Sequence, residues 1–143
     1  MATVELRFSA LPEHVRTARL VAAAVARRAG VDEAVLDEVR LAVGEACSRA
    51  VGLHQSGGIV APVKVLLIEE EKQFSIEVGD EAPRHAPGDR APGIAGDDAE
   101  TDEDEMGLAV ISGLVDDVEV TAGEHGGSIR MTWPSTPSVV VLP

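Results

Sequence analysis

The feature that most constrains the fold is a run of apolar residues, spaced three or four apart, within residues 36–53. This spacing matches the period of an α-helix, so the segment predicts one helix with a single apolar face. Asp32 precedes the run as a candidate N-cap, and Gly57 and Gly58 end it. Such a helix must bury its face against a second layer. The face consists of Leu36, Val39, Val43, Ala46, Ala50 and Leu53.

The rest of the chain predicts further helices and several short strands. Residues 4–8 alternate apolar and polar like a half-buried strand, and an alanine-rich helix follows between Pro12 and Gly30. Helices combined with mostly antiparallel strands favour an α+β class, a two-layer α/β sandwich with helices on one face of the sheet. The remaining predicted elements are strands at 63–68, 74–78, 118–120 and 128–133 and a short helix at 108–114.

Two segments have the composition of irregular structure. Residues 81–106 are rich in Pro, Gly, Ala and acidic residues, which predicts a flexible acidic lid loop. Residues 134–143 form a C-terminal tail, for which we keep two alternatives: disorder, or pairing with a sheet edge or a second subunit. The expected domain therefore spans residues 1–133, with the loop inside it.

Charge and cysteine content exclude several classes of protein. A formal net charge of -13 over 143 residues disfavours nucleic-acid binding, which needs clustered Lys and Arg, and suits a basic protein partner. No signal peptide and no membrane-spanning run of about 20 apolar residues is visible. The single Cys47 fits a reducing cytoplasm and a core position. The four histidines have no metal-like spacing, so no metal ligands are assigned.

Three separated motifs resemble those of the GHKL-type ATPases, which share the Bergerat fold. Glu45 in LAVGEACSRAV resembles the N-box acid, the general-base position, and Asp80 in IEVGDEAPR resembles the aspartate of the first glycine box. Gly107 and Leu108 in EMGLAVISGLVDDVEV resemble the end of the second glycine box. Over most of residues 1–133 the chain is similar to the anti-sigma-factor serine kinases of bacteria. This resemblance implies a homodimer that holds a sigma factor inactive and uses ATP and magnesium to phosphorylate an anti-anti-sigma (STAS-type) protein.

One departure from the family pattern affects the metal. Four residues after the N-box acid the family has a magnesium-ligating asparagine, and this chain has Arg49. A guanidinium has no acceptor and stays charged, so it cannot ligate a cation. Two further readings stay open: Glu45 and Arg49 form a helix-surface ion pair, or Arg49 contacts a nucleotide phosphate. A paired Glu45 would be a poorer general base.

The glycine boxes depart from the pattern as well. Ala82 and Arg84 stand at glycine positions of the first box, and Pro83 between them lacks a backbone donor. Asp80 could accept a hydrogen bond from an adenine amine or serve only as a turn residue. Residues 102–105 are all acidic and precede the helix whose N-terminus would hold phosphate, so they would repel a triphosphate.

These departures predict a regulator with a degenerate ATP site at Glu45, Arg49, Asp80, Ala82, Arg84, Gly107 and Leu108. We expect it to bind a sigma factor or an anti-anti-sigma protein in the cytoplasm without kinase activity and without ATP or magnesium. One alternative is an active kinase that tolerates Arg49. Another is a sensor whose remodelled pocket binds a different small nucleotide.

Overall fold

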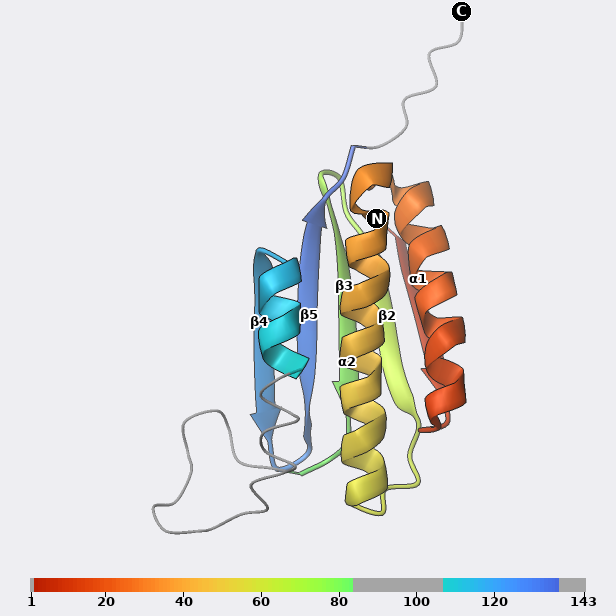
Figure 1. Ribbon diagram of the computed structural model, residues 1–143, viewed down its shortest axis with the longest axis vertical. Helices are drawn as coiled ribbons and strands as arrows, with labels where there is room; N and C mark the ends of the chain where they lie inside the picture. The colour runs from red at the N-terminus through yellow and green to blue at the C-terminus, as the bar shows by residue number, and fades with distance from the viewer. Residues whose placement is uncertain (1, 84–106, 137–143) are drawn as a thin grey trace, which may run out of the picture.

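The computed structural model describes residues 2–83 and 107–136, which form a five-stranded sheet with helices on one face (Figure 1). The strand order is β1-β2-β3-β5-β4, and all four pairings are antiparallel. The expected α+β class and two-layer sandwich are confirmed. The elements are β1 (Ala2–Phe8), η1 (Pro12–His14), α1 (Val15–Ala29), η2 (Glu33–Val35), α2 (Leu36–Ser56), β2 (Val63–Glu69), β3 (Gln73–Asp80), a helix over residues 107–114, β4 (Asp117–Gly123) and β5 (Gly126–Pro134).

The connection between α1 and α2 has the capping chemistry that the sequence predicts. Gly30 ends α1 with φ 96°, a left-handed conformation that favours glycine, and its N–H donates to the carbonyls of Ala26 and Arg27. The Asp32 side chain then accepts the N–H of Ala34 at 2.9 Å, at the short 3-10 turn that leads into α2. These two caps bring α2 back antiparallel to α1.

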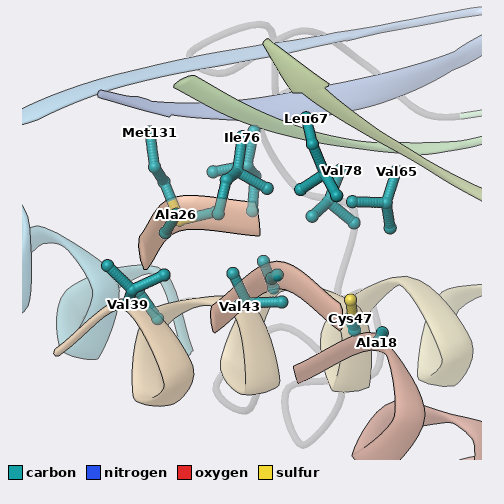
Figure 2. Close-up of a cluster of buried hydrophobic side chains, with 14 of the residues drawn as sticks. Ala18, Ala26, Val39, Val43, Cys47, Val65, Leu67, Ile76, Val78 and Met131 are labelled. Carbon is teal, nitrogen blue, oxygen red and sulfur yellow. The ribbon is translucent and has the colours of Figure 1, made fainter. Parts of the chain in front are cut away.

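The core lies between the helices and the sheet. Figure 2 shows Val39, Val43 and Cys47 of α2 pointing toward sheet residues that include Ile76 and Leu67. Each fully buried aliphatic side chain of this kind contributes roughly 1.5–3 kcal/mol to stability. The predicted apolar face of α2 is confirmed at five positions and is half-buried at the sixth: Leu36, Val39, Val43, Ala46 and Ala50 are buried, and Leu53 is partly exposed.

The opposite face of the sheet is mostly polar. Its strands place Arg7 beside Lys64, and the hydroxyls of Ser75 and Thr132 are hydrogen-bonded at 2.9 Å. Alternation along the strands accounts for this difference, because successive side chains point to opposite faces.

Most of the predicted loop and most of the predicted C-terminal tail lie outside the described residues. Of the predicted loop, residues 84–106 lie outside them, and so do residues 137–143 of the predicted tail. Before that point, the N–H of Ser135 donates to the Lys72 carbonyl and that of Thr136 to the Gly30 carbonyl. Among the helices of the described chain, none is long and apolar enough to cross a membrane.

Candidate functional site

Helix α2 carries the first two site residues on one side. Glu45 is exposed between the buried Gly44 and Ala46, and Arg49 lies one helical turn further on, half-buried. The ion pairs formed between described residues do not include one that joins Glu45 to Arg49. The helix-surface ion pair considered from the sequence is thus not formed, and Glu45 does not use its carboxylate on Arg49.

The helix over residues 107–114 begins next to Glu45. A methyl group placed on Gly107 would lie 4.0 Å from Oε2 of Glu45, so the carboxylate is close to the first described turn of this helix. Leu108 follows, partly buried against the core. The sequence assigned Glu45 and Gly107 to two separate motifs, and the fold brings them together.

Strand β3 ends at Asp80, the residue that resembles the aspartate of the first glycine box. Asp80 pairs in register with Gly127 of β5 and is 7% exposed. Its Oδ1 accepts the N–H of Ala82 at 3.0 Å, which makes the start of the following segment a local turn. The methyl group of Ala82 is buried. Arg84, the last predicted site residue, lies outside the described residues.

Two residues that the sequence did not assign to the site hold this turn. His54, fully buried near the end of α2, accepts the N–H of Glu81 at Nε2 and lies 2.9 Å from the Ala61 carbonyl through Nδ1. Gly126, at the start of β5, abuts the Asp80 carbonyl with φ 114°. No spacing rule links positions 54, 81 and 126, since they come together only where the end of α2 packs against β3 and β5. The one signal in the sequence was His54 itself, a histidine at an apolar position of α2.

Cys47 is buried on α2, the helix that carries Glu45 and Arg49. Burial raises the pKa of the Cys47 thiol to about 12, so the thiol stays protonated and is a poor nucleophile. In the part of the chain that the structure describes, no three His, Cys, Asp or Glu residues lie close enough to hold a metal ion. Among the described residues, the charged side chains of the predicted site are the carboxylates of Glu45 and Asp80 and the guanidinium of Arg49.

Comparisons with known proteins agree on one fold. Residues 8–133 match the model of the family described as "Histidine kinase-like ATPase domain". The structure is similar to the crystal structure of the RsbU and RsbW domains of Rv1364c from Mycobacterium tuberculosis, with a TM-score of 0.68 and 16% identity. That match covers 100% of this chain and 35% of the other, so the chain spans about a third of the protein it matches. None of the curated proteins matches.

Proposed function

Because this chain belongs to the histidine kinase-like ATPase family, we propose that it is an anti-sigma-type regulator that acts by binding and not by phosphorylation. Its partner in this proposal is a sigma factor or an anti-anti-sigma protein of the STAS type, in the cytoplasm. The likeness to a chain that contains an RsbW domain supports this class of partner. The net charge of -13 also favours a partner with a basic surface. A homodimer, as the family resemblance implies, is part of the proposal.

One observation carries the proposal: Arg49 lies one turn from Glu45 on α2. Glu45 faces the start of the helix over residues 107–114, where related ATPases would bring metal and phosphate together. Magnesium needs oxygen ligands in near-octahedral geometry. A guanidinium supplies no oxygen and adds a fixed positive charge beside the metal position. Arg49 therefore argues against magnesium-assisted phosphoryl transfer.

The end of β3 also fits Mg²⁺–ATP poorly. The Ala82 methyl group is buried where the family pattern has a glycine, so the backbone is less open to a ligand. One carboxylate oxygen of Asp80 already accepts the Ala82 N–H. The described residues thus lack both a metal ligand at position 49 and the glycine at position 82, so they do not fit a bound Mg²⁺–ATP.

A second candidate function rests on Asp80 itself. Its carboxylate is nearly buried and is held in a fixed turn, and a carboxylate is a hydrogen-bond acceptor for an N–H group of a ligand. A nucleoside without a triphosphate could use this acceptor and would avoid the metal position altogether. The second candidate is therefore a sensor that binds a nucleoside-like ligand at the Asp80 side.

The proposal is tested by mixing the purified chain with the sigma factors and STAS-type proteins of the same genome. Complexes are measured by size-exclusion chromatography with light scattering, with and without ATP and magnesium, and phosphoryl transfer is followed with γ-labelled ATP. We expect a complex with one of these proteins, unchanged by ATP and magnesium, and no labelled serine.

Glu45→Ala is the matched control in both assays. A pure binder keeps its partner after this change, because no reaction depends on the carboxylate. Serine labelling by the wild-type chain that disappears in Glu45→Ala would replace the proposal with an active kinase.

A further inference from the structure

The Asp80–Glu81 peptide bond is held from two sides by residues distant in sequence. Its N–H is bound by the imidazole of His54, 27 positions earlier, at 2.9 Å. Its carbonyl oxygen lies against Gly126, at the start of β5. We call the set of His54, Ala61 and Gly126 around this peptide the Asp80 clamp.

The partners of His54 fix its tautomer. Ala61 offers only a carbonyl oxygen, so Nδ1 must carry the proton and donate it. Glu81 offers only an N–H, so Nε2 must be unprotonated and accept it. The His54 ring is fully buried, and its two nitrogens connect α2 to Ala61, before β2, and to Glu81, directly after β3. An apolar core residue at position 54 would leave the Glu81 N–H without its acceptor, which would destabilise the turn after β3.

Gly126 completes the clamp for a steric reason. A β-carbon at this position would overlap the carbonyl oxygen of Asp80 and lie 2.8 Å from the α-carbon of Glu81. Its φ of 114° is also one that other residues rarely adopt. Gly123 stands at the other end of the same turn and would meet nothing within 4 Å, so it is the matched control.

We infer that His54 is a positioning residue for Asp80: through the Glu81 N–H it sets the direction of the Asp80 carboxylate, and Gly126 supports the same peptide from the other side. The inference deepens the second candidate function and depends on it only where Asp80 binds a ligand. The chemical class expected at Asp80 is a neutral N–H donor, for which adenosine is the probe. The clamp itself is measured without any ligand.

The direct test is NMR on the uniformly ¹⁵N-labelled wild-type chain. A scalar coupling across the hydrogen bond, between the Glu81 amide nitrogen and His54 Nε2, reports this contact alone. We expect the coupling, together with ring ¹⁵N shifts of a histidine protonated only at Nδ1. A ring protonated at Nε2 with no such coupling would overturn the inference, and no variant has to fold for this result.

Two substitutions of His54 then separate its two hydrogen bonds. His54→Gln places a carbonyl oxygen where it can accept the Glu81 N–H, whereas His54→Asn retains only a donor toward Ala61. We expect Glu81 amide exchange to be about tenfold faster in His54→Asn and close to wild type in His54→Gln. Equal exchange in the two variants would contradict the positioning role.

Gly126→Ala and Gly123→Ala test the contact that Gly126 makes with the Asp80–Glu81 peptide. Gly126→Ala is expected to shift the Asp80, Glu81 and Ala82 amide signals, and Gly123→Ala to leave them in place. If both glycine variants shift these signals equally, Gly126 has no special part in the clamp.

Adenosine titration, followed on the Ala82 amide, keeps the two proposals apart. We expect the wild type to bind adenosine, His54→Asn to bind it at least tenfold more weakly, and His54→Gln to recover the affinity. This result supports both the nucleoside sensor and the positioning role of His54. A wild type that shows the coupling but binds no adenosine removes the nucleoside sensor and leaves the clamp intact. Adenosine binding that is equal in all His54 variants removes the functional role of the clamp.

Discussion

At the scale of single residues, Arg49 has the largest consequence. It lies on α2, one turn from Glu45, and Glu45 faces the start of the helix over residues 107–114. Its charge persists at every ordinary pH, so no protonation change turns the position into a metal ligand. In our proposal Arg49 disfavours a metal ion beside Glu45, whereas Asp80, at the end of β3, is a carboxylate held in a fixed turn.

Arg49→Asn is predicted to increase the effect of magnesium on ATP binding. A unit charge about 4 Å from an ion costs about 1 kcal/mol even in bulk water, so the ratio of ATP affinities with and without magnesium should rise at least about fivefold. The ratio is measured by calorimetry. Arg49→Lys keeps the charge and should retain the wild-type ratio; equal ratios in the two variants would show that the charge is not what excludes the metal.

Cys47 predicts a pH dependence of stability in the alkaline range. Burial raises its pKa from 9.0 to about 12, so above pH 9 the unfolded chain loses a proton that the folded chain keeps. Stability should therefore be unaffected below pH 9 and should fall as the pH rises toward 12, by about 1.4 kcal/mol per pH unit. Chemical denaturation between pH 8 and 10.5 measures this.

Cys47→Ala is the control for that prediction. It lacks the thiol, so its stability should lose this slope, although the smaller side chain lowers its stability at every pH. The chain has no tyrosine, and its two lysines are present in both proteins, so few other groups obscure the comparison. Parallel pH curves for the two proteins would refute the role of the thiol.

At the scale of elements, the glycines differ in what they do. Gly30 takes a left-handed conformation that ends α1, whereas Gly52 lies exposed within α2 and a β-carbon there would meet nothing within 4 Å. The first glycine is required by backbone geometry. The second only lowers the helix propensity of α2.

Alanine substitutions at these two glycines should have opposite effects. Gly30→Ala is predicted to lower the free energy of unfolding by about 1–2 kcal/mol, because an L-residue is strained in the left-handed region. Gly52→Ala should raise it by about 0.5–1 kcal/mol, through a higher helix propensity and a less flexible unfolded chain. Urea denaturation measures both, and a stabilising Gly30→Ala would contradict the capping role.

The elements themselves were largely predictable, whereas the connections around the site were not. Periodicity, Gly30 and Asp32 located α1 and α2 because caps and apolar faces are local properties of the chain. The clamp on Asp80 could not be predicted, since it depends on how β3, β5 and the end of α2 meet in three dimensions. The Glu45–Arg49 ion pair was allowed by local spacing, yet the structure does not form it, because spacing alone does not decide which way two side chains point.

At the scale of the whole molecule, one core cluster joins the two layers. It includes residues from α1, α2, β2, β3 and β5, and Trp133 of β5 is among its buried members. A single continuous core of this size favours one cooperative unfolding transition. Leu108 packs against this core, and His54 of α2 accepts the N–H of Glu81, directly after β3.

Unfolding is therefore predicted to be two-state by independent probes. Trp133 is the only tryptophan and the chain has no tyrosine, so intrinsic fluorescence reports the β5 region, while far-UV circular dichroism reports mainly the helices. The two midpoints in urea should coincide. Separate midpoints would show that the sheet and the helical layer unfold independently.

The most direct measurement of the central claim is isothermal titration of the wild-type chain with ATP, with and without magnesium. If the site has lost its metal chemistry through Arg49 and the missing glycines, magnesium should not strengthen ATP binding. Tight binding of ATP that requires magnesium would contradict the account and identify the chain as a nucleotide-dependent kinase.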